Sequence, residues 1–437
     1  MGGKSAKMKS KVSKPLKVAK TVKKAAPAPK KPNLKKALAS KAEPKLSKKE
    51  TQALSKTKAL EVAKKSLQAP TDAFLSKWKP KNESFEAGLD RFLGDLGFAE
   101  KERAPLLPDL IEKLYTSMRK EGLSPAIEEQ LQERFPKDRV HKLGSIFTMK
   151  PKTSIRLNYL KADIAGFSNS LVAQELKMKR SRISPWAFEV GKPEGLKNHP
   201  LIDRGVFEIE DEGHQLVSLL SNARPGQRVL DLCANFGNNS LNMSMMMRNK
   251  GSLFVYEAEP KRIKMFRERA AKAGIDNFRV LTDGQLGEVK SLDIVMVEAP
   301  SSHIGEVSGR PELKWRFHKE ELTRLHKLQA ALLREGARKL KLGGHLVYAT
   351  TSLSKSENEG QIEHFLRTSH NSYRLVPIQQ YMKDYVMPYV QNYFNFQWDE
   401  KLLQSMLETD PFLLLSPDVH GCQGLFVSVI QRTRIST

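Results

Sequence analysis

The C-terminal half of the sequence predicts a doubly wound α/β domain, a Rossmann-like fold with a mainly parallel sheet. Short apolar runs alternate with longer segments of helical character, the order that builds such sheets. The runs are apolar on both faces, as strands are when helices cover both sides of a sheet. The first of them ends in an acid, Asp231. Because ligands of these folds bind beyond the carboxyl ends of the strands, we expect the functional site there.

Each element follows from its pattern. Apolar runs predict strands at 227–233, 252–257, 278–282, 292–298 and 344–349. Helical stretches lie between them, at 240–248, 261–273 and 319–340. These elements define a main domain at residues 206–437.

Two smaller parts precede this domain. Residues 146–205 predict a compact α+β module, with strands at 154–158 and 184–190 and a helix at 171–176. Residues 71–145 predict a helical N-terminal domain, because apolar residues recur at helical spacing in 85–96 and 107–118.

The first 70 residues have the composition of a disordered tail. They hold 21 lysines and three glutamates, a net charge of +18 out of +25 for the chain. Such a segment attracts polyanions through counterion release, or it only aids solubility. No arginine occurs before Arg91. Lysine-rich runs such as 23–36 favour a nuclear or nucleolar address, with a mitochondrion or other organelle as the alternative.

Cysteine and apolar content exclude several classes of protein. Cys233 and Cys422 are the two cysteines, too few for a disulfide framework or a cysteine-rich zinc site. No apolar run approaches the roughly 20 residues that cross a membrane. We therefore expect no metal and no membrane partner.

A set of ordered motifs resembles the S-adenosylmethionine-dependent RNA cytosine-5 methyltransferases, the family of the bacterial 16S rRNA enzymes of the Fmu type and the nucleolar proliferation antigen. The set covers about residues 150–432. The matching segments are 154–161 (SIRLNYLK), 205–211 (GVFEIED), 226–234 (GQRVLDLCA), 255–257 (VYE), 260–262 (PKR), 282–284 (TDG), 298–300 (EAP), 310–315 (RPELKW), 328–329 (LQ), 343–350 (GGHLVYAT), 356–359 (SENE) and 420–426 (HGCQGLF).

The resemblance implies a cofactor site and RNA contacts. The cofactor, S-adenosylmethionine, would touch Asp231, Ala234, Asn235, Phe236, Gly237, Asn238, Asn239, Glu257, Arg262, Asp283 and Glu298. RNA would touch Arg156, Asn158, Lys161, Arg310, Lys314 and Trp315. Trp315 is equally compatible with a core tryptophan.

The chain departs from the family at the two positions of the catalytic cysteines. In the family a cysteine thiolate adds to C6 of cytosine, and a second cysteine assists release of the product. Here those positions are Ser301 and Thr351. A hydroxyl needs a dedicated base, whereas a thiol is already partly ionised at neutral pH. No histidine–acid pair is evident beside Thr351, and His303 is a weak candidate base for Ser301.

The cofactor loop departs too. The family reads Cys-Ala-Ala-Pro-Gly-Gly-Lys where this chain reads CANFGNN at 233–239. Asn239 removes a positive partner for the cofactor's carboxylate, and Phe236 adds bulk. Asn238 replaces a glycine and tolerates unusual backbone angles. Whether S-adenosylmethionine still binds stays open.

Three functions follow from these observations. The first is an RNA-binding pseudo-methyltransferase, acting on ribosomal RNA as a ribosome biogenesis or assembly factor. The alternative is an active S-adenosylmethionine-dependent RNA methyltransferase of altered chemistry, which attacks a more nucleophilic atom. The third is a general polyanion or chromatin binder that works through the basic tail.

Overall fold

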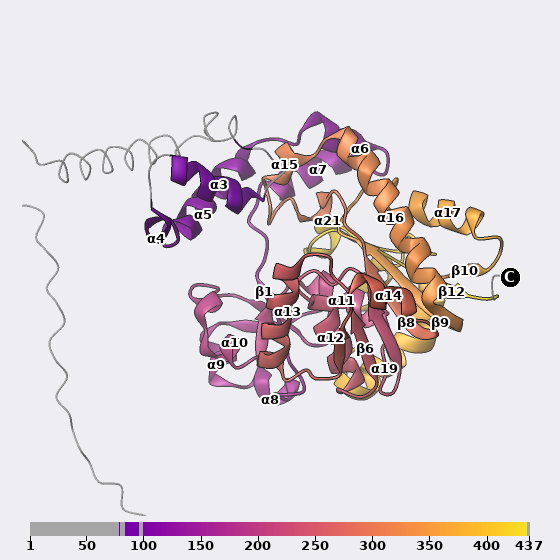
Figure 1. The fold of residues 1–437 in the computed structure, drawn as a ribbon. Helices are drawn as coiled ribbons and strands as arrows, with labels where there is room; N and C mark the ends of the chain where they lie inside the picture. Colours follow the sequence, from indigo (N-terminus) through magenta and orange to yellow (C-terminus); the bar gives the residue numbers. More distant parts are fainter. Residues whose placement is uncertain (1–77, 79–83, 96–98, 435–437) are drawn as a thin grey trace, which may run out of the picture. The chain divides into compact units, whose positions relative to one another are not determined.

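The computed structural model describes residues 78, 84–95 and 99–434 (Figure 1). The basic tail and its predicted disorder lie outside the described residues. Within the described part, no helix is long and apolar enough to cross a membrane.

Helices form the first described part. They are α3 (Phe85–Asp95), α4 (Glu100–Arg103), α5 (Leu107–Lys120), α6 (Pro125–Gln132) and α7 (Lys137–Phe147). The helices predicted at 85–96 and 107–118 are α3 and α5. Their apolar faces meet in one cluster that includes Phe85, Leu89 and Leu114. Helices α6 and α7 instead add Leu131 and Leu143 to the core beneath the main sheet.

A four-stranded antiparallel sheet follows, in the order β2-β3-β1-β4. Its strands are β1 (Ser154–Leu157), β2 (Met178–Arg180), β3 (Ala187–Val190) and β4 (Phe207–Ile209). Helices α8 (Ile164–Ser168), α9 (Leu171–Glu175) and α10 (Pro200–Asp203) connect them, with a 3-10 turn at Leu196–Asn198. Strand β4 lies just beyond the predicted module boundary at 205.

The main sheet has the order β10-β12-β9-β8-β5-β6-β7, with β11 on β12. Its strands are β5 (Arg228–Asp231), β6 (Ser252–Val255), β7 (Phe278–Val280), β8 (Leu292–Glu298), β9 (Leu340–Thr350), β10 (Tyr373–Val376), β11 (Leu413–Leu415) and β12 (Leu425–Arg432). Strands β5 to β9 pair in parallel, and the last three pair antiparallel. The α/β fold class is therefore confirmed, and its strand order changes direction at β5 and β8.

Helices cover both faces of this sheet. They are α11 (Glu212–Leu220), α12 (Asn238–Met247), α13 (Pro260–Ala273), α14 (Asp283–Glu288), α15 (Leu313–Arg316), α16 (Lys319–Lys339), α17 (Glu359–Thr368), α18 (Ile378–Tyr381), α19 (Met387–Phe394), α20 (Glu400–Met406) and α21 (Pro417–His420), with a 3-10 turn at Ile304–Glu306 and a π-helical stretch at Met382–Val386.

Side chains that alternate along the strands pack into two hydrophobic cores, one on each face of the main sheet. Val229 and Met296 point to the face that α11, α12 and α13 cover. Leu230 and Val295 point to the other face, where α16 runs beside β8 and β9 (Figure 1). Strands that bury both faces read as continuous apolar runs, which is why the sequence predicted them. The methionines of α12 are buried packing residues.

Candidate functional site

Parallel pairing of β8 with β9 brings together the two positions where the family carries cysteines. Glu298 pairs with Ala349, so the loops after both strands leave the sheet side by side. Ser301 and Thr351 are both buried, and their hydroxyl oxygens lie 3.4 Å apart. The two side chains the sequence singled out therefore share one point at the carboxyl edge of the sheet.

A histidine and an acid do lie beside Thr351, contrary to the sequence expectation. The Nδ1 atom of His303 is 2.6 Å from Thr351 Oγ1 and 3.1 Å from Glu306 Oε1. A base relay needs one ring nitrogen for the acid and the other for the hydroxyl. Here one nitrogen faces both partners. If Nδ1 of His303 carries a proton, it cannot accept the proton of the Thr351 hydroxyl. If Nδ1 carries no proton, its lone pair faces the negatively charged carboxylate of Glu306.

Glu306 adds to this constraint. Burial alone would raise its pKa, but the positive charges of His303 and Arg310 outweigh burial and hold the pKa well below its usual range. Arg310 Nη1 lies 3.2 Å from the carboxylate. An ionised Glu306 is a poor proton acceptor. The Nδ1 atom of His303 is therefore shared between the Thr351 hydroxyl and an ionised carboxylate.

Glu357 holds the two loops together. Its Oε1 accepts from the backbone N–H of Ser302 at 2.8 Å, and its Oε2 accepts from the hydroxyl of Ser352 at 2.5 Å. Gln329 donates to Glu357 and to the carbonyl of Pro300. The segments 328–329 and 356–359 that matched the family therefore position the loops.

The two cysteines of the chain offer no substitute nucleophile. Burial raises the pKa of the Cys233 and Cys422 thiols well above the usual range, and nearby carboxylates add to the effect. Among these carboxylates, Asp231 has the largest effect on Cys233, and Asp211 on Cys422. Since the thiolate is the reactive form, both cysteines are inert at neutral pH.

The loop after β5 keeps the turn of a nucleotide-binding fold. Gly237 has φ of 89°, and a Cβ atom there would come within 2.1 Å of the Phe266 ring. Only glycine fits. Asn238 has no need of unusual angles, because it begins α12; the left-handed asparagine is Asn235, with φ of 50°. Phe236 is 40% exposed, and Arg262 lies over its ring at 5.8 Å.

Asp231 has an unsatisfied oxygen. Its Oδ2 accepts from the Ser240 hydroxyl at 2.6 Å, while its buried Oδ1 has no partner among the described residues. Burial raises the pKa of Asp231 to about 7, and the charge of Glu298 adds to the effect. A buried carboxylate oxygen without a partner at the strand end suits a ligand that donates a hydrogen bond.

Asn239 stands where the family has a lysine, and its side chain is bonded to other groups of the protein. Asn239 donates to Glu298 at 2.5 Å and accepts from Ser218 at 2.7 Å. His214 Nε2 lies 3.5 Å from the same glutamate. Burial lowers the pKa of His214, but surrounding carboxylates, led by Glu298, outweigh burial and raise it. The raised pKa favours the charged form of His214 close to where the family has a lysine, a role that the sequence did not reveal.

Most of the hydrogen-bond acceptor positions of the Glu257 carboxylate are already in use. It accepts from the backbone N–H groups of Asn235 at 2.9 Å and Glu259 at 3.0 Å, and from Arg262 at 3.5 Å. A carboxylate offers about four acceptor positions, so about one is left for a ribose hydroxyl. Asp283 is exposed at the start of α14 and accepts from Tyr256 at 2.7 Å, which raises the pKa of Tyr256 to about 12. Ala234 is buried beside this edge.

Several predicted RNA contacts face the protein instead. Arg156 is 2% exposed and pairs with Glu208 and Glu210. Asn158 is buried and donates to two backbone carbonyls. Lys314 is buried and donates to carbonyls at the end of α5, and burial lowers its pKa to about 8. Their polarity satisfies buried groups, so in this conformation they are not available to RNA.

The other predicted contacts lie nearer the surface. Lys161 is exposed, although its ammonium group donates to the Arg204 carbonyl at 2.7 Å. Arg310 is partly exposed and pairs with two glutamates. Trp315 is partly buried against the cluster of α3 and α5, the packing role left open by the sequence.

A cavity of about 600 Å³ adjoins the site and is rimmed by lysines. Gly309 and Asp211 line it on the side of the site, the latter 3.9 Å from His214. Lys150, Lys152 and Lys197 are exposed on its rim. The first two make ion pairs with surface glutamates, which are weak in water. Among the described residues, no cluster of side chains is suited to hold a metal ion.

Comparison with known proteins gives one family. Residues 218–431 match the profile described as 16S rRNA methyltransferase RsmB/F. The chain is 27% identical over 256 residues to the probable ribosomal RNA small subunit methyltransferase B of Bacillus subtilis, covering 57% of each chain. It is 25% identical over 236 residues to the ribosomal RNA small subunit methyltransferase F of Escherichia coli, covering 53% of this chain and 46% of that one. The chain thus spans about half the length of these relatives.

Solved structures agree on the fold. A methyltransferase homologue from Pyrococcus horikoshii has a TM-score of 0.55 at 23% identity, covering 71% of this chain and all of that one. NSun6 from the same organism, crystallised with SFG, has a TM-score of 0.58 at 15% identity, covering 72% of this chain and all of that one.

Proposed function

Because the chain belongs, through residues 218–431, to the S-adenosylmethionine-dependent RNA cytosine-5 methyltransferase family, we propose that it binds ribosomal RNA without methylating cytosine C5 through a thiol adduct. The observation that carries the proposal is the pair Ser301 and Thr351, whose hydroxyls meet where the family has thiols. His303 is poorly placed to activate Thr351, because a single nitrogen faces both Thr351 and Glu306, and it meets Ser301 through its backbone N–H.

S-adenosylmethionine fits the residues at the nucleoside end. The Gly237 turn, the unpartnered Asp231 oxygen and the remaining acceptor of Glu257 could hold it. At the amino-acid end, Asn239 already donates to Glu298 and supplies no charge. The cofactor would contribute an electrophilic methyl group. The chain's own residues would orient it, but they offer no thiol to raise the nucleophilicity of cytosine C5.

RNA would lie on the lysine-rimmed cavity. Lys150, Lys152 and Lys197 surround a hollow that reaches the site through Asp211. Cations at the mouth of such a hollow attract phosphates without reading sequence. An assembly role in ribosome biogenesis, in the nucleus or nucleolus, follows from this binding together with the basic tail.

A two-part assay tests the proposal. Full-length protein, S-adenosylmethionine with a tritiated methyl group, and total cellular RNA should yield no 5-methylcytosine. The same protein should crosslink to structured ribosomal RNA, and Lys150→Glu/Lys152→Glu should weaken that binding about tenfold by reversing two charges. Lys250→Glu/Lys290→Glu, an equal change at exposed residues outside the cavity, is the matched control.

Each outcome discriminates. Transfer to cytosine C5 that is lost on changing Ser301 or Thr351 would overturn the proposal. Transfer to another atom would establish the altered chemistry instead. Equal weakening by both lysine pairs would remove the cavity as the RNA site.

A further inference from the structure

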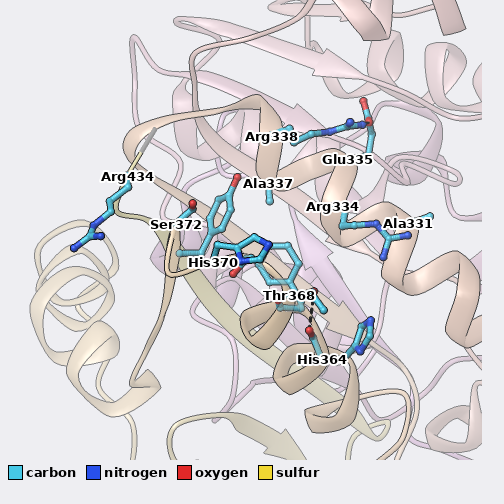
Figure 2. A pocket seen from close by; sticks show the side chains of 13 residues that line it. Ala331, Arg334, Glu335, Ala337, Arg338, His364, Thr368, His370, Ser372 and Arg434 are labelled. Atoms are coloured by element: carbon cyan, nitrogen blue, oxygen red, sulfur yellow. Dashed lines mark hydrogen bonds and ion pairs between the residues drawn. The ribbon is translucent and has the colours of Figure 1, made fainter. Parts of the chain in front are cut away.

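A second cavity, of about 980 Å³, lies between α16, α17 and the start of β10 (Figure 2). The last turns of α16 lead into β9 at Leu340, which pairs with Leu292 at the start of β8. This cavity is therefore at the amino edge of the parallel strands. Asp231 and Glu298 end their strands at the opposite edge. The two sites can be altered independently.

The cavity is rich in cations. Three arginines line it against one carboxylate, Glu335, and two histidines, His364 and His370, line it as well. That carboxylate already pairs with Arg338 and Lys339. Within the part of the chain that the structure describes, the guanidinium groups of Arg334 and Arg434 have no hydrogen bond or ion pair. The lining therefore carries excess positive charge that its own acid does not neutralise, which suits an anionic ligand.

Two aromatic side chains also line this cavity. The rings of Phe365 and Tyr373 pack 5.2 Å apart at an angle of 53°. Figure 2 shows Arg334 and Arg338 on the wall formed by α16, His364 and Thr368 on the wall formed by α17, and His370 between them. Small residues of α16 leave room above the rings. Aromatic faces beside guanidinium groups and hydroxyls are the surroundings that a nucleotide requires.

We propose that this cavity binds a nucleotide unit, with the phosphate at the unpaired guanidinium of Arg334, beside Arg338 on the same helix, and the base against His370 and Tyr373. The inference goes beyond the proposed function, which places RNA at the carboxyl edge. The unit comes either from a single-stranded segment of RNA or from a free nucleotide. A cavity of this volume has the size of a small-molecule site, and its open arginines also suit a continuous strand.

Charge reversal tests the phosphate contact. Full-length Arg334→Glu/Arg338→Glu should bind a fluorescent single-stranded oligoribonucleotide at least tenfold more weakly than the wild type. The slope of log affinity against log salt should become less negative by about 0.7, because the contact to one phosphate of the strand is lost. Arg324→Glu/Lys327→Glu places the same charge change on the same helix outside the cavity and should leave both quantities nearly unchanged. The basic tail is identical in all of these proteins.

A second variant tests the base contact. His370 has φ of 49°, so His370→Gly removes the ring without straining the backbone. We expect oligoribonucleotide binding to weaken about fivefold with an unchanged salt slope, as loss of stacking predicts. Equilibrium dialysis with adenosine and uridine monophosphate separates the two sources. Saturable uptake of a mononucleotide identifies a free-nucleotide site, and binding of the oligomer alone identifies RNA.

The outcomes separate this inference from the proposed function. If the arginine pair and its control change binding equally, or if neither does, the cavity is not a nucleotide site. If Lys150→Glu/Lys152→Glu abolishes binding while the arginine pair leaves it intact, the cavity inference fails and the proposed function stands. The reverse result would keep the cavity and remove the carboxyl-edge surface.

Discussion

At the scale of single residues, the chemistry of the site follows from a few buried polar groups. The sequence identified Ser301, Thr351 and Asp231, because each stands at a motif position. It named His303 only as a weak candidate base for Ser301 and missed His214, since a histidine's role depends on which acids the fold places around it. The i, i+3 spacing of His303 and Glu306 was the available signal. It becomes meaningful only when Thr351, far along the chain, is known to lie 2.6 Å away.

Asp231 makes the stability of the protein depend on pH. Burial raises the pKa of Asp231 to about 7 in the folded state, whereas the pKa in the unfolded chain is about 4. The contribution of Asp231 to the free energy of unfolding is therefore fully present below about pH 4 and is lost as the pH rises through about 7. From pH 5 to pH 8 the wild type should lose roughly 2 to 3 kcal/mol of unfolding free energy relative to Asp231→Asn, at about 1.4 kcal/mol per unit. Urea denaturation at both pH values measures this. A difference between the two proteins that stays constant with pH would refute the assignment.

Asp293→Asn is the matched control. Burial would raise the pKa of Asp293, but the backbone N–H of Arg228 and the charge of Lys341 outweigh it and lower the pKa. Its contribution is present above the unfolded pKa and lost as the pH falls, so Asp293→Asn should leave the interval from pH 5 to pH 8 unchanged.

At the scale of elements, the sequence predicted the five parallel strands of the main sheet, β5 to β9, and three of the domain's helices, α12, α13 and α16. Long apolar runs and helical periods are local properties, which is why they could be read directly. Strands β10 and β11 were not predicted, because they are three or four residues long and gain stability only from pairing with β12. The roles of charged strand residues could not be read either. Arg156 resembled an RNA contact, yet it joins β1 to Glu208 of β4 and to the first residue of α12, Asn238.

Arg156 therefore links the small sheet to the main domain. It donates to Glu210 at 2.6 Å and to the carbonyl of Asn238 at 3.1 Å. Replacing it with methionine leaves the Glu210 carboxyl buried without its ion-pair partner, which should cost about 3–5 kcal/mol of unfolding free energy in urea denaturation. Arg156→Met/Glu210→Leu should recover most of this loss, because it removes both charges and keeps the volume. A single variant as stable as the wild type would show that the pair is not coupled.

At the scale of the whole molecule, charge is divided between the tail and the folded domains. Residues 1–70 carry +18 of the net charge of +25. The folded part places some of its cations around two cavities, lysines at one and arginines at the other. The tail should therefore supply affinity that is independent of RNA structure, while the folded part should select structured RNA.

Deleting residues 1–70 separates these contributions. We expect the truncated chain to bind structured ribosomal RNA with lower affinity and a less steep salt dependence, because many phosphate contacts disappear together. We also expect a fluorescent fusion to lose nuclear accumulation, since lysine-rich runs such as residues 23–36 act as nuclear addresses. Changing the six lysines of that run to glutamine should reproduce the loss of localisation with a smaller effect on RNA binding. Loss of all RNA binding on truncation would instead favour a general polyanion binder. Unchanged localisation would show that the nuclear localisation signal lies in the folded part of the chain.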